Sequence, residues 1–254
     1  LTTSSAASDV YKRQILMLAA NEKSLAERFL THLSEGLSEQ NLLKLESFLI
    51  ELDDPHIQIR FGKRQAGTGI IMFNSYFALH AMVDYQWVVP SDLLLSIARR
   101  ESEFDQNAKS SAGAMGLMQV MPGTAKDMAK ILQIPFEEES LLTSWKYNVL
   151  LGATYLQELS YKYRGNPILI AAAYNAGPTN ADKWIENLGN PLDQTTDLID
   201  WVEMIPFRET RNYVMRITES LTLYKALIEE NEIDHNFSEF LGSSAYFSFT
   251  PKSE

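Results

Sequence analysis

The segment SDLLLSIARRES carries a carboxylate at the end of an apolar helical stripe. Leu94, Ile97 and Ala98 recur at three- and four-residue steps, and Glu101 follows seven residues after Leu94 on the same face. Burial disfavours the charged form of a carboxyl group, so its pKa rises towards the value that a general acid needs near neutral pH. Glu101 is therefore the first candidate catalytic residue. The alternative is a helix-end glutamate that reaches solvent or pairs with a neighbouring arginine.

The helix that carries Glu101 offers no obvious second carboxylate. Glu103 lies about 200° further around a helix, so we interpret it as a solvated residue. Asp105 would return to the face of Glu101, but the turn-forming residues that follow predict that the helix ends first. Glycoside hydrolysis commonly uses two carboxylates, whereas a substrate-assisted reaction uses one acid and a nucleophile of the substrate. A single acid favours the second route.

A glycine-bearing loop, SSAGAMGLMQVMPGTA, follows this helix. Gly113 and Gly116 allow tight turns and close approach to a ligand. Gln119 is a polar residue inside an apolar run and needs a partner in the protein or in a substrate. The loop could line a substrate cleft, although its methionines more often fill a core.

Two further segments combine polar residues with helix signals. AAAYNAGP ends an apolar helix with Tyr174 and Asn175, and the Tyr174 hydroxyl could point at Glu101. A core tyrosine and a helix-breaking asparagine explain the same pair without function. IPFRETRNYV begins a long helix and gathers charged residues, which at a helix start usually cap or pair.

Helices must position these residues, because apolar residues recur at helical spacing and nothing alternates with period two for long. The sequence predicts helices from Ser91, near 125–132, over about 144–163, before AYNAGP, and over about 208–230. A small irregular strand pair is possible in 107–121. The fold class is predicted to be mainly α.

The sequence divides into four parts at changes of composition. Residues 1–14, LTTSSAASDVYKRQ, resemble translated adapter sequence, so the native chain is expected to begin near Ile15, already truncated. Residues 15–82 are interpreted as a helical-hairpin, solenoid-type linker region, and residues 83–230 hold the candidate chemistry. Residues 231–254 form a tail without a clear period.

Composition excludes several classes of function. The chain of 254 residues has 22 Lys+Arg against 33 Asp+Glu, a net charge of −11 that repels nucleic acid. It has no cysteine, and its four histidines lack metal-ligand spacing, so we expect no metal and no cofactor. No apolar run is long enough to predict a transmembrane segment. Oligomeric state is not indicated.

In order, the segments RRESEF, SSAGAMGLMQVMP, AAAYNAGP and PFRETRNYV resemble the motif set of the soluble lytic murein transglycosylases, family 1 of the lytic transglycosylases. The resemblance is strong over about 83–230 and looser over 15–82. It implies a lysozyme-like catalytic domain after a helical linker region. It also implies a periplasmic enzyme acting on peptidoglycan glycan strands, although no export signal is visible.

The resemblance implies roles for seven residues. Glu101 matches the sole catalytic acid, then base, that cleaves the bond between N-acetylmuramic acid and N-acetylglucosamine without water, leaving a 1,6-anhydromuramoyl end. The matched substrate-binding residues are Ser110, Gln119, Met121, Tyr174, Asn175 and Glu209. Trp184 and Trp201 could be sugar platforms, although core packing is the simpler role.

Two alternatives stay open. A goose-type lysozyme shares the fold and the region around the acid but hydrolyses the same bond. A catalytically silent glycan-binding scaffold would keep the cleft and has no need for a desolvated acid.

Overall fold

The computed structural model describes residues 28, 32, 34–193 and 196–230. The expectations for residues 1–14 and 231–254 concern residues outside this part of the chain. Within it, no helix is both long and apolar enough to cross a membrane. The chain divides into two compact units, 1–79 and 80–254, which are described separately below.

The first unit is built from α3 (Glu39–Glu51), α4 (Pro55–Ala66) and α5 (Phe73–Tyr76). Its core gathers apolar residues at helical spacing, namely Leu42, Leu45, Leu49, Ile57, Phe61 and Met72. The Asp54 carboxylate accepts from the Ile57 N–H at 3.2 Å and so begins α4. Buried Glu46 accepts from the Ser75 N–H at 3.0 Å and ties α3 to α5. This unit packs without contributing any of the predicted site residues.

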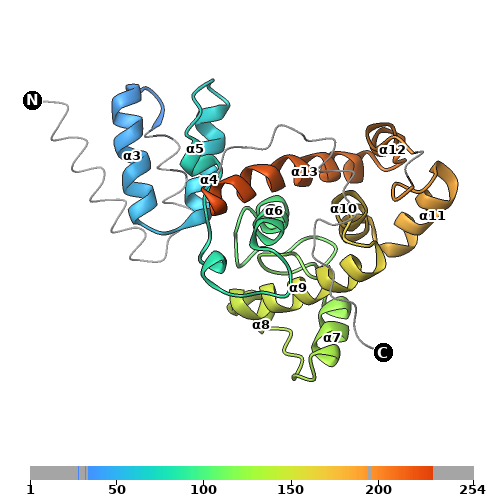
Figure 1. The fold of residues 1–254 in the computed structure, drawn as a ribbon. Coiled ribbons are helices and arrows are strands. Elements are labelled where there is room, and N and C mark those ends of the chain that lie inside the picture. The colour runs from blue at the N-terminus through green and yellow to red at the C-terminus, as the bar shows by residue number, and fades with distance from the viewer. Residues whose placement is uncertain (1–27, 29–31, 33, 194–195, 231–254) are drawn as a thin grey trace, which may run out of the picture. The chain divides into compact units, whose positions relative to one another are not determined.

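The second unit begins with a 3₁₀ turn, η1 (Ala81–Asp84), and continues with helices (Figure 1). These are α6 (Ser91–Ser102), α7 (Pro122–Ile131), α8 (Ser140–Thr143), α9 (Trp145–Lys162), α10 (Pro167–Ala176), α11 (Pro178–Leu188), α12 (Leu198–Met204) and α13 (Arg208–Glu229). Isolated bridges join Lys109 to Met115 and Met115 to Val120, and the described residues form no regular strand. The prediction of a mainly α fold is therefore confirmed.

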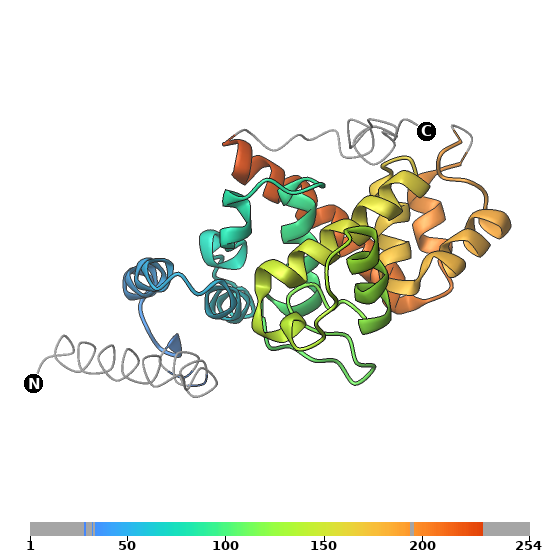
Figure 2. The same ribbon diagram turned by 90° about the horizontal axis from the view of Figure 1, so that it is seen from below.

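The core of this unit lies around α13, against which both α6 and α10 pack (Figure 1). On α6, Leu93, Leu94 and Ile97 are fully buried, and α10 buries every residue from Pro167 to Ala173. Helix α9 packs against α7, α8 and α10, as the view from below in Figure 2 also shows. Trp184 and Trp201 are core residues, 6% and 0% exposed, so neither is a surface platform for a sugar.

One prediction needs correction, and one is confirmed with an addition. Glu103 does not continue the face of α6, because the helix ends at Ser102 and Glu103 takes a left-handed conformation with φ 53°. Gly177 and Pro178 do end α10, but Pro178 also begins α11, since proline fits the first turn of a helix. The helices α11 and α12 were not predicted from the sequence.

Candidate active site

Glu101 lies in the last turn of α6 and meets α13. The Tyr213 hydroxyl donates a hydrogen bond of 2.7 Å to Glu101 Oε1. Tyr213 is itself 2% exposed, and the Arg100 guanidinium lies 5.8 Å from the centre of its ring. The carboxyl group is thus held between two helices rather than pointing freely into solvent.

Burial dominates the ionisation of Glu101. It raises the pKa of this carboxyl from an ordinary 4.5 to about 7, because the charged form loses hydration. The Tyr213 hydrogen bond and the Arg100 charge lower the pKa, and the Glu209 charge raises it. At neutral pH a substantial fraction of Glu101 therefore carries the proton that a general acid must donate.

The chain turns sharply after this helix. Glu103 and Phe104 both have left-handed backbone, with φ of 53° and 63°, which is unusual for a bulky residue. The Phe104 ring is buried and packs 5.4 Å from His80, centre to centre. Ser102 Oγ donates to the Leu117 carbonyl at 2.7 Å. These contacts join the end of α6 to the loop that follows.

The side chains of Gln119 and Ser110 form hydrogen bonds within that loop. Gln119 has a left-handed backbone with φ 47°, and its Nε2 donates to the carbonyls of Ala108 at 3.0 Å and Gly116 at 2.9 Å. The partner that Gln119 requires thus lies in the protein. Ser110 Oγ accepts from the Ala114 N–H at 2.9 Å. These bonds shape the loop, and within the part of the chain that the structure describes, none of them reaches Glu101.

The apolar run of the loop has two roles. Met115, Leu117 and Met118 are buried, as expected of core residues. Met121 is 43% exposed at the start of α7, so its side chain is available to a ligand.

Tyr174 and Asn175 lie at the end of α10. The Tyr174 hydroxyl donates to the Met118 carbonyl at 2.7 Å, not to Glu101 as the sequence suggested. Burial and the charge of Glu101 both raise the pKa of Tyr174, so the two groups lie within electrostatic reach of each other. Asn175 Oδ1 accepts from Thr210 Oγ1 at 2.7 Å, which ties α10 to the first turn of α13.

The site therefore gathers five ionisable groups from three helices: Arg100 and Glu101 on α6, Tyr174 on α10, and Glu209 and Tyr213 on α13. Glu209 is exposed and acts on Glu101 through its charge. Sequence reasoning missed Tyr213 as the direct partner of Glu101. Its position four residues after Glu209, on the same face of a helix, was the available signal.

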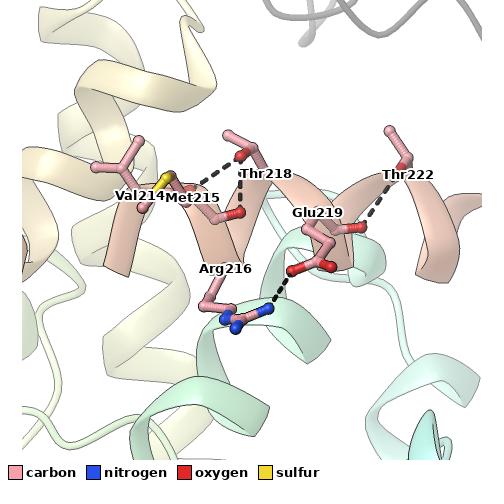
Figure 3. Close-up of polar contacts among 6 residues, drawn as sticks. All are labelled: Val214, Met215, Arg216, Thr218, Glu219 and Thr222. Carbon is pink, nitrogen blue, oxygen red and sulfur yellow. Dashed lines mark hydrogen bonds and ion pairs between the residues drawn. The ribbon is translucent and has the colours of Figure 1, made fainter. Parts of the chain in front are cut away.

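A separate pocket lies on α13, α12 and the start of α10, with a volume of about 680 Å³. It is lined by apolar and polar residues of α13, six of which Figure 3 shows, including an Arg216–Glu219 ion pair of 2.8 Å. None of the predicted site residues lines this pocket. Among the described residues, no group of three His, Asp or Glu side chains could hold a metal ion.

The family model of the transglycosylase SLT domain matches residues 79–196. These residues are similar to the transglycosylase SLT domain. The soluble lytic murein transglycosylase of Escherichia coli K12 is 38% identical over 130 residues, which are 51% of this chain and 20% of the relative. The chain thus spans about a fifth of the length of this relative.

Two solved structures are similar to this chain over most of its length. The 70 kDa soluble lytic transglycosylase of Escherichia coli matches with a TM-score of 0.74 and 28% identity, covering 86% of this chain and 35% of its own. The Pseudomonas aeruginosa lytic transglycosylase Slt matches with a TM-score of 0.68 and 25% identity, covering 90% and 37%. The latter is an inactive variant in which a glutamate is replaced by glutamine.

Proposed function

We propose that this chain is a peptidoglycan lytic transglycosylase that cleaves the β-1,4 bond between N-acetylmuramic acid and N-acetylglucosamine. The observation that carries the proposal is Glu101, a partly buried carboxyl group whose pKa is raised to about 7 within an SLT domain. Relatives with the same domain are named lytic murein transglycosylases. The loss of activity in the glutamate-to-glutamine variant of the Pseudomonas protein supports an essential glutamate.

In the proposed reaction, Glu101 acts twice. Its carboxyl proton passes to the glycosidic oxygen as the bond from that oxygen to the muramoyl C1 breaks, and N-acetylglucosamine leaves with a free hydroxyl. The substrate N-acetyl group assists at C1. The Glu101 carboxylate then takes the proton of the muramoyl C6 hydroxyl, whose oxygen bonds to C1. The enzyme ends protonated, as it began, and no water is consumed.

The remaining site residues are proposed to bind the glycan. Met121 offers an exposed apolar side chain, and Glu209 offers an exposed acceptor within electrostatic reach of Glu101. Ser110 and Gln119 shape the loop, while Tyr174 and Asn175 connect it and α13 to α10. For these four residues, substrate contact is proposed in addition to the observed structural bonds.

A hydrolase of the goose-type lysozyme class is the second candidate, because Glu209 is a carboxylate close enough to act on Glu101. In such an enzyme a second carboxylate could activate water. Digestion of purified sacculi followed by mass spectrometry separates the two. Anhydromuramoyl ends, one water lighter than hydrolysed ends, support the proposal, and reducing muramic ends overturn it.

A glycan-binding scaffold without activity is the third candidate, and a zymogram on cell-wall material tests it. A cleared band that is absent for Glu101→Gln supports catalysis. An intact gel from folded wild-type protein favours the scaffold. Because the proposed substrate lies outside the cytoplasmic membrane, we place the protein in the periplasm, acting on glycan strands.

A further inference from the structure

A buried amide on α9, that of Asn148, bonds both ends of the turn at Met115–Met118. Asn148 is fully buried. Its Nδ2 donates to the carbonyls of Met115 at 2.8 Å and Leu141 at 3.1 Å, and its Oδ1 accepts from the Met118 N–H at 2.8 Å. Three of the four hydrogen bonds that an asparagine side chain can make are therefore used within the protein. Such a group sets where the backbone of the turn must lie.

Close packing around Asn148 prevents this turn from shifting towards α9. Gly116 has a φ of 74°, and a Cβ there would lie 2.2 Å from the Leu141 oxygen and 2.3 Å from Asn148 Nδ2. Gly152 lies one turn after Asn148 on the same face of α9. A Cβ at Gly152 would lie 2.6 Å from Met118 Sδ. The turn therefore packs directly against α9, with no room for a Cβ at Gly116 and room for one at Gly152 only if the Met118 side chain moves.

The consequence appears at the Met118 carbonyl, which accepts the Tyr174 hydroxyl at 2.7 Å. Tyr174 lies close enough to Glu101 for the charge of the carboxylate to raise the pKa of the phenol. A phenol has one proton to donate. In the described structure the Tyr174 hydroxyl donates that proton to the Met118 carbonyl. Among the described residues, Tyr213 is then the one phenol that donates a hydrogen bond to Glu101.

We propose that Asn148 is a positioning residue: by fixing the Met118 carbonyl, it keeps the Tyr174 hydroxyl proton away from Glu101. This rests on the proposed function, in which Glu101 must stay protonated near neutral pH. A second phenol donor would stabilise the carboxylate and lower its pKa. Too small a fraction of Glu101 would then be protonated at neutral pH. The other charged or titratable groups that face Glu101 are Arg100 on α6 and Tyr213 and Glu209 on α13.

The test is an NMR titration of the Glu101 carboxyl carbon in the free protein, assigned by its absence in Glu101→Gln. Asn148→Ala releases the turn, so the midpoint falls by about one pH unit as Tyr174 turns to Glu101. Tyr174→Phe alone leaves the midpoint near that of the wild type. In the double variant the phenol is missing, so the fall disappears. A purely structural role for Asn148 gives no such dependence on the Tyr174 hydroxyl.

Asn166→Ala is the matched control, because Asn166 is also fully buried but caps α10 by accepting from the Leu169 N–H at 3.1 Å. Asn166→Ala should lower the melting temperature without changing the midpoint of the Glu101 titration. If Asn148→Ala does not fold, Asn148→Ser keeps a polar group at the buried site but is too short to bond both Met115 and Met118, and the same fall is expected.

An unchanged midpoint in every folded variant that displaces the turn overturns the proposal. So does a rise of about one unit in Tyr174→Phe, since that would mean Tyr174 already donates to Glu101. The titration uses no substrate. An inactive or hydrolytic wild-type protein would therefore overturn the proposed function. The titration of Glu101 would still test the role of Asn148.

Discussion

The Tyr213 hydroxyl lies 2.7 Å from Glu101 Oε1, although the two residues are 112 positions apart in the chain. The contact joins α6 to α13, two of the helices that pack together in the core of the second unit. It stabilises the charged form of the carboxyl group, while burial stabilises the neutral form. Burial is the larger effect, and the balance leaves the pKa near the pH at which the proposed acid must work.

Removing the Tyr213 hydroxyl tests how its hydrogen bond and burial together set the pKa of Glu101. In Tyr213→Phe the carboxylate loses its phenol donor, so the pKa of Glu101 rises by about one unit above the wild-type value. Because activity requires the protonated form, it should persist to correspondingly higher pH. Tyr163→Phe is the control, since the Tyr163 hydroxyl bonds Asp182 at 2.9 Å and Pro178, away from Glu101. A fall in the Tyr213→Phe midpoint would contradict the account.

The raised pKa of Glu101 also predicts how stability depends on pH. Between pH 4.5 and about 7 the folded protein holds a proton at Glu101 that the unfolded chain releases, so this group's contribution to stability is lost as pH rises. Glu101→Gln removes that dependence. At pH 8 the variant should be more stable than the wild type by up to about 3 kcal/mol, with little difference at pH 4. Chemical denaturation at both pH values measures it, and equal gains at both would contradict the prediction.

Two glycines of the loop should differ sharply in their tolerance of alanine. Gly116→Ala forces a Cβ to 2.2 Å from the Leu141 oxygen, so we expect a loss of about 3 kcal/mol or more. Gly113 has a similar φ of 92°, but a Cβ there would meet nothing within 4 Å. Gly113→Ala should therefore cost only the backbone strain, about 1 to 2 kcal/mol. Equal losses in thermal denaturation would show that the turn is not packed as described.

The variant Glu209→Gln distinguishes a transglycosylase from a hydrolase. In a transglycosylase, Glu209→Gln removes a neighbouring negative charge, so the pKa of Glu101 falls slightly and turnover persists, with weaker glycan binding. The shift should shrink in high salt, because Glu209 is exposed. Glu219→Gln, exposed and in the separate pocket, should change neither property. Complete loss of turnover in Glu209→Gln would instead favour a hydrolase with a second carboxylate.

Local sequence patterns predicted α6, α7, α9, α10 and α13, and the face of α6 on which Glu101 lies. The stripe Leu94, Ile97, Ala98 extends to Glu101, and periodicity alone reports which side of a helix is apolar. The helix α12 escaped prediction because seven residues are too few to show a period. Its beginning is set by Asp197, which accepts from the N–H groups of Ile199 and Asp200 at 2.9 and 3.0 Å.

The partners within the site could not be predicted in the same way. Tyr174 and Tyr213 both come close to Glu101, and the sequence favoured the wrong one as its hydrogen-bond donor. The choice depends on where the Met118 carbonyl lies, and the N–H of the same residue is bonded by Asn148 on another helix. Such contacts depend on tertiary packing, which the periodicity of one segment does not report.

Digestion of sacculi in water enriched in oxygen-18 tests the central claim most directly. If Glu101 activates the muramoyl C6 hydroxyl, mass spectrometry will find muramoyl ends that are one water lighter than reducing ends and contain no oxygen-18. Glu101→Gln should reduce their yield by about a hundredfold or more. Muramoyl ends that carry oxygen-18 at C1 as they form, or wild-type turnover by Glu101→Gln, would contradict the account.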